Sequence, residues 1–144
     1  MKYLRLFSLA ALFAFVSLGV SAQKPGYTRY VITKHIDKDG NTKPATGGSG
    51  YWIKFEGNLA FLDMGFGTEN RFIYDSTQSN GNKLYYLQAW NYGTMNQGSG
   101  WVTQRNTYLL VSPNRSVINH ILGYGWGGSV LRIQTANDVG GMIE

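Results

Sequence analysis

Short runs of apolar and aromatic residues alternate with turn-forming residues along most of the chain. The clearest run is residues 51–56, where Tyr51, Ile53 and Phe55 fall on one face of an extended strand and polar or charged residues fall mostly on the other. Strict alternation of this kind is typical of a β-strand with one buried face. The same reading predicts seven strands, over residues 27–36, 51–56, 59–64, 71–76, 83–90, 101–111 and 130–135.

Glycine and asparagine separate several of these runs and predict hairpin connections. Gly57-Asn58 lies between the second and third runs, and Asn80-Gly81 precedes the fifth. Asn-Gly is the strongest short hairpin signal because both residues tolerate positive φ. The fold class that follows is mainly β, as a single antiparallel β-barrel or β-sandwich of about seven strands.

One segment departs from the two-residue period. Residues 113–122 follow Ser112, a helix-capping residue, begin with Pro113 and end before Gly123. The apolar residues of this segment recur at helical spacing, at Val117, Ile118, Ile121 and Leu122. The pattern therefore predicts one short helix near 113–122.

The amino-terminal residues have the pattern of a secretory signal peptide. Lys2 and Arg5 precede an apolar stretch over residues 6–20, and small residues end at Ala22. We expect cleavage near Ala22, which divides the chain into a signal peptide, 1–22, and a single mainly-β domain, 23–144. The mature protein is then secreted or periplasmic, and it contains no other segment apolar enough to span a membrane.

Charge and cysteine content exclude several classes of function. Removal of Lys2 and Arg5 from the 13 basic residues leaves 11 against 8 acidic residues, a net charge of +3. Such a small excess predicts no nucleic-acid partner. The chain has no cysteine, so the domain is disulfide-free and has no thiol nucleophile.

Candidate catalytic groups are few, and no catalytic residue is assigned. The only histidines are His35 and His120, and no Gly-x-Ser-x-Gly surrounds a serine. His120 is expected to be a partly exposed helix residue. A small glycosidase would need two carboxylates facing one cleft, from Glu56, Asp63, Glu69 and Asp75, and the sequence does not place these four relative to one another, so ordinary solvated or ion-paired carboxylates are favoured. We expect a binding domain rather than an enzyme, without a cofactor.

A metal site is not predicted either. Asp37, Asp39 and Asn41 resemble half of a calcium loop, but Gly48 stands where the closing glutamate would be. The same residues are typical of a hairpin turn.

Aromatic residues concentrate in glycine-rich connections, and the richest is residues 89–101, which contain no charged side chain. Flat rings beside neutral amides are suited to carbohydrate, because C–H groups stack on a ring while hydroxyls pair with amides. A second turn, 123–129, adds two more rings. The predicted ligand-binding residues are Trp90, Asn91, Tyr92, Asn96, Gln97, Trp101, Tyr124 and Trp126.

Two alternatives remain open. Tyrosine and tryptophan are also enriched at protein interfaces, so the same surface would suit a protein-interaction or inhibitor domain of the cell envelope. Gly50-Tyr51-Trp52 resembles the Gly-x-Trp of lipocalin-type barrels, which implies that Arg132 packs over Trp52 and that a small apolar ligand binds inside the barrel. The resemblance covers four residues and a strand precedes the motif, so the family is not assigned.

Overall fold

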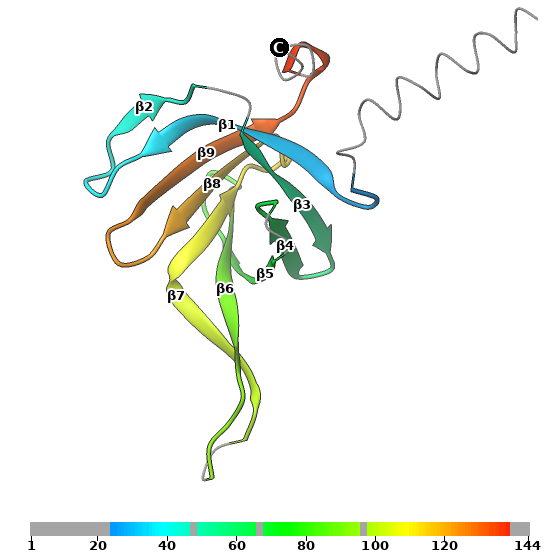
Figure 1. The fold of residues 1–144 in the computed structure, drawn as a ribbon, viewed down its shortest axis with the longest axis vertical. Coiled ribbons are helices and arrows are strands. Elements are labelled where there is room, and N and C mark those ends of the chain that lie inside the picture. Colours follow the sequence, from blue (N-terminus) through cyan, green and yellow to red (C-terminus); the bar gives the residue numbers. More distant parts are fainter. Residues whose placement is uncertain (1–23, 47–48, 66–67, 96–97, 139–144) are drawn as a thin grey trace, which may run out of the picture.

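Nine strands form one antiparallel sheet in the computed structural model, which describes residues 24–46, 49–65, 68–95 and 98–138 (Figure 1). The strands are β1 (Thr28–Ile36), β2 (Thr42–Pro44), β3 (Gly50–Glu56), β4 (Leu59–Asp63), β5 (Glu69–Thr77), β6 (Lys83–Asn91), β7 (Gly100–Val111), β8 (Val117–Leu122) and β9 (Gly127–Ile133). From β3 to β9 each strand pairs with the next one in sequence. The predicted mainly-β, antiparallel class is therefore confirmed.

The sheet closes into an eight-stranded barrel through β1. One edge of β1 pairs with β9 from Tyr30↔Ile133 to Ile36↔Gly128. The other edge is shared, because β3 pairs with the first half of β1 and the short strand β2 pairs with the second half. The arrangement is a barrel rather than a sandwich, and β2 is an additional strand outside the ring of eight.

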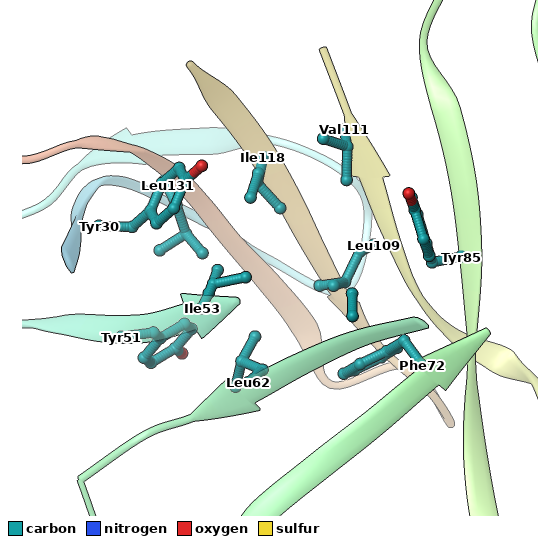
Figure 2. Close-up of a cluster of buried hydrophobic side chains, with 11 residues drawn as sticks. Tyr30, Tyr51, Ile53, Leu62, Phe72, Tyr85, Leu109, Val111, Ile118 and Leu131 are labelled. Atoms are coloured by element: carbon teal, nitrogen blue, oxygen red, sulfur yellow. The ribbon is translucent and has the colours of Figure 1, made fainter. Parts of the chain in front are cut away.

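Side chains from most of the strands fill the barrel interior (Figure 2). Ile53, Leu62 and Phe72 are fully buried, and Tyr51 is buried beside them. An eight-stranded barrel is just wide enough for side chains to fill. The alternation predicted for residues 51–56 is confirmed, since the first two apolar residues lie in this core and Phe55 packs against it.

The predicted helix near 113–122 is wrong. Residues 117–122 form β8, which pairs with β7 on one side and β9 on the other. The segment before it is a tight turn in which Arg115 has a φ of 60°, a left-handed conformation that a helix does not contain. The Asn114 side chain accepts a hydrogen bond from the Ser116 backbone N–H at 3.0 Å and stabilises that turn. The β-branched residues of β8 suit a strand between two partners, and this tertiary pairing overrides the helical spacing.

The strand count also exceeds the predicted seven. The two additions in the described residues are β8 and β2, and β2 falls between the predicted strands 27–36 and 51–56. All three residues of β2 are exposed, and Lys43 pairs with His35 of β1. A strand this short with no buried face leaves no alternating pattern in the sequence.

A glycine allows β9 to approach the end of β1. Gly127 has a φ of 78°, and a Cβ at this position would lie 2.0 Å from the Ile36 carbonyl oxygen. Gly127→Ala should therefore lower the free energy of unfolding by more than about 2 kcal/mol, because backbone must move in addition to the φ strain. Urea denaturation would measure the loss.

Gly125→Ala is the matched control for this prediction. Gly125 has a similar φ of 75°, but a Cβ there would point into open space. Gly125→Ala should lower the free energy of unfolding by only about 1–2 kcal/mol, because the left-handed backbone conformation is the only source of strain. Equal losses for the two alanine variants would contradict the close approach at Gly127.

Candidate functional site

The hairpin of β6 and β7 extends well beyond the barrel (Figure 1). The two strands pair from Lys83↔Val111 to Tyr86↔Tyr108, and the register then shifts so that Leu87 pairs with Gln104. Residues 105–107 of β7 form the bulge between these two stretches. We call residues 87–104 the arm, because β5 and β8 support little of it.

The arm carries the first two predicted binding residues as a direct cross-strand pair. Trp90 pairs with Trp101, and their ring centroids lie 5.2 Å apart at an interplanar angle of 75°. Their exposed fractions are 44% and 45%, so each ring is partly supported and partly open to solvent. Edge-to-face packing of this kind holds two rings in a defined orientation.

Two side chains that the sequence reasoning missed complete this face. The Arg71 guanidinium carbon lies 4.4 Å from the centroid of the Trp101 ring. Arg71 also donates a hydrogen bond from Nε to Gln88 Oε1 at 2.9 Å, across the β5–β6 pairing. Gln88 and Trp90 are two residues apart on one strand and therefore face the same side. The arm thus presents two rings next to a fixed guanidinium and an amide.

The tip of the arm adds exposed groups. Tyr92 is strongly exposed, as is Met95. Asn91 is oriented by a turn, in which its Oδ1 accepts a hydrogen bond from the Gly93 backbone N–H at 3.2 Å. Two further predicted binding residues, Asn96 and Gln97, lie outside the described residues.

The remaining predicted residues lie on the β8–β9 turn. Tyr124 and Trp126 are exposed at 87% and 77%. The turn leaves the same end of the barrel as the arm, because successive strands alternate in direction. It contacts the base of the arm, where the Gly123 N–H donates a hydrogen bond to Thr107 Oγ1 at 3.1 Å. In the part of the chain that the structure describes, no ring contact joins these two residues to the tryptophan pair.

The residues that resemble the lipocalin motif are arranged differently from what that resemblance implies. Trp52 is half-buried, and the guanidinium of Arg29 lies 5.3 Å from its ring centroid. Arg132 instead binds Asp138 through two hydrogen bonds of 2.6 and 2.7 Å. The expected packing of Arg132 over Trp52 is therefore replaced by an Arg29 contact from β1.

Three of the four candidate carboxylates have basic partners. Lys54 Nζ lies 3.2 Å from Glu56, Lys24 Nζ 2.7 Å from Asp63 and Arg105 3.6 Å from Asp75. The hydrogen bond from Lys24, with help from the Gly65 N–H, holds the pKa of Asp63 below its ordinary value. Glu69 is exposed at the start of β5. Glu69 lies directly opposite Asp63 in the β4–β5 pairing, and the Asp63 carboxylate is bound by Lys24.

His120 is a core residue, so the expectation of a partly exposed helix position is wrong. Its ring lies edge-on to Tyr51 and Phe72, with centroid distances of 5.5 and 6.0 Å. Burial lowers its pKa from 6.5 to about 4. A neutral, buried imidazole packed between two rings has the surroundings of a structural residue.

The calcium-like segment folds as a turn between β1 and β2. Asp37 Oδ1 accepts hydrogen bonds of 2.9 Å from the backbone N–H groups of Asp39 and Asn41. Across the described ranges, no three residues among histidine, aspartate and glutamate are grouped as metal ligands would be. The same ranges contain no helix of sufficient length and apolarity to cross a membrane.

Comparisons with protein-family models, with curated proteins and with solved structures found no match for this chain. The fold defines a closed eight-stranded antiparallel β-barrel with an extended aromatic hairpin.

Proposed function

We propose that this protein is a secreted or periplasmic, non-catalytic binding domain that recognises carbohydrate through the arm. The observation that carries the proposal is the half-exposed pair of Trp90 and Trp101, held beside Arg71 and Gln88. The amino-terminal pattern ending near Ala22 supports export, because it has the charged, apolar and small-residue parts of a signal peptide.

The chemistry of the arm supports a neutral sugar chain as the ligand. An indole ring offers a flat π-face to the C–H groups of a pyranose. Arg71 and Gln88 offer hydrogen-bond donors for hydroxyl groups, and the Gln88 amide also accepts. Residues 84–104 contain no charged side chain, so Arg71 supplies the charge next to the ring pair and the rest of the arm offers an ionic ligand no partner. The packed barrel interior favours this outer surface over an internal site for an apolar ligand.

Calorimetric titration with soluble dextran, laminarin, mannan and xylan tests the proposal. We expect saturable binding of at least one of these polysaccharides. Trp101→Ala should weaken that binding at least tenfold, since tryptophan at the centre of a binding surface is a dominant contributor. Calorimetry does not depend on the fluorophore that the substitution removes.

Trp126→Ala is the matched control. It removes an exposed indole ring from the β8–β9 turn, which makes no ring contact with the Trp90–Trp101 pair among the described residues. Its affinity should stay within twofold of the unsubstituted chain if the arm is the site. Absence of binding to all four polysaccharides, or equal affinity of the Trp101→Ala variant, would refute the proposal.

A protein-interaction domain is the second candidate. It is favoured by Tyr124 and Trp126, whose rings project from the β8–β9 turn without support from the tryptophan pair. Aromatic residues of this kind are enriched at protein interfaces. If this candidate is correct, substitution of Tyr124 or Trp126 should abolish binding of the partner protein, and substitution of Trp101 should not.

A further inference from the structure

The outer edge of β7 along the arm has no strand paired to it in the described part of the chain. β8 pairs with β7 only from Tyr108 to Val111. The preceding stretch of β7, Gly100–Gln104, pairs with β6 along one edge only. β6 itself pairs with β5 only as far as Gln88, so β5 does not extend along the rest of the arm. The backbone N–H and C=O groups of alternate residues along the outer β7 edge therefore point to solvent.

This edge lacks the features that normally prevent strand addition. Edge strands of soluble proteins are protected by lysine, proline, bulges or a covering element. Residues 84–104 contain neither a charged residue nor a proline, and the flanking charges are at Lys83 and Arg105. The bulge over residues 105–107 lies at the base of the arm and leaves the edge beyond it regular. An isolated two-stranded ribbon is also marginally stable by itself, so a further strand would stabilise the arm.

We propose that two copies of this chain associate by antiparallel pairing of their β7 edges over Gly100–Gln104. A two-fold antiparallel contact centred on Val102 places this residue against its own counterpart, and every other residue against the one equally far on the opposite side of the centre, so a charge at the centre would repel itself. An uncharged edge has no such repulsion, which favours a second copy as the occupant. The result is a four-stranded sheet in the order β6-β7-β7-β6.

Val102 sets the expected register. Its side chain is 43% exposed at the centre of the free edge and lies across from Ala89. Pairing centred on Val102 brings the two valines together and covers them. Trp101 and Thr103 alternate with Val102 along β7, so they lie on the opposite face. The tryptophan pairs of both copies would then share one face of the joined sheet, which would give two adjacent aromatic surfaces.

Charge substitution at Val102 tests the pairing in the full chain, expressed with its own amino-terminal segment. In sedimentation velocity across a concentration series, the sedimentation coefficient of the unsubstituted protein should rise from that of a monomer to that of a dimer. Val102→Lys and Val102→Glu should each remain monomeric, because like charges meet at the centre of the contact. An equimolar mixture of the two variants should dimerise again, because opposite charges then meet.

Val117→Glu is the matched control. Val117 is exposed to the same degree, 42%, but lies on β8 within the barrel and pairs with Arg132. This variant should dimerise like the unsubstituted chain. Circular dichroism of all variants reports that the barrel is folded. A chain that is monomeric at every concentration overturns the proposal. A dimer that persists in Val102→Lys, or a mixture that fails to recover dimers, also overturns it.

Discussion

Acidification from pH 7 to pH 4 should cost the protein about 3 kcal/mol of stability through His120 alone. Its folded-state pKa is about 4, against 6.5 when exposed. Between these values the unfolded chain binds a proton that the folded chain does not, so stability falls as pH falls through this window. The contribution is fully present above pH 6.5 and fully lost below pH 4, and 2.5 pKa units correspond to about 3 kcal/mol.

The physical cause is the position of the ring in the core. His120 lies between Tyr51 and Phe72, and its Nδ1 is a buried atom with no hydrogen-bond partner. A protonated imidazole would have an unpaired N–H in this apolar setting, which is costly. Two carboxylates with lowered pKa values, Asp63 and Asp138, also lose stabilising contacts on acidification, but only below their ordinary range near pH 4.

Urea denaturation between pH 4 and pH 7.5 measures this dependence. His120→Leu removes the titrating group and the unpaired nitrogen, so its free energy of unfolding should be nearly constant across the window. The control is His35→Gln, which changes an exposed histidine on β1 and should keep the slope. A slope that persists in His120→Leu would contradict the assignment to His120.

The strands that were predicted correctly have strong local signals. Alternation at Tyr51, Ile53 and Phe55 gave the buried face of β3, and Gly57-Asn58 gave the β3–β4 turn, with Glu56 paired to Leu59. Closure of the barrel by β1 and β9 joins residues about 100 positions apart. No local pattern specifies such a contact, so the sequence left barrel and sandwich as alternatives.

The contact between Arg71 and Trp101 shows why the site could be predicted only in part. The rings were recognisable from composition, but Arg71 reaches them through strand register. Counting pairs outward from a two-residue Asn80-Gly81 turn places Arg71 opposite Trp90. The actual turn is longer, and a bulge between Tyr74 and Ser76 shifts the register so that Arg71 pairs with Gln88. Because bulges leave no reliable mark in one sequence, the partner on β5 was missed.

The error at residues 113–122 has a similar origin. Val117, Ile118, Ile121 and Leu122 satisfy a helical period, yet the burial of β8 alternates, with Ile118 and His120 inward. Histidine between two apolar residues conceals the two-residue period, because it is polar in the sequence and buried in the fold. Burial of His120 is thus one reason why the strand was missed, beside the helix-capping signals at Ser112, Pro113 and Gly123.

Phe72→Ala should lower the free energy of unfolding by about 3–5 kcal/mol, the largest effect expected from a single substitution in this chain. Phe72 is fully buried on β5 and packs edge-on against His120, so its removal leaves a cavity at the centre of the barrel. Phe61→Ala provides a matched control, because Phe61 lies on the neighbouring strand β4 with its side chain on the outer face. The centroid of its ring lies 5.1 Å from Lys54 Nζ. That variant should lose only about 1 kcal/mol.

Thermal and urea unfolding of both phenylalanine variants would measure the difference. A large gap between Phe72→Ala and Phe61→Ala is expected because the two side chains differ in which face of the sheet they occupy. Comparable losses would mean that Phe61 is covered as fully as Phe72. The outer surface of β4 would then be an interior surface, and the inside–outside assignment that places Arg71 and the tryptophan pair on the exposed face would have to be reversed.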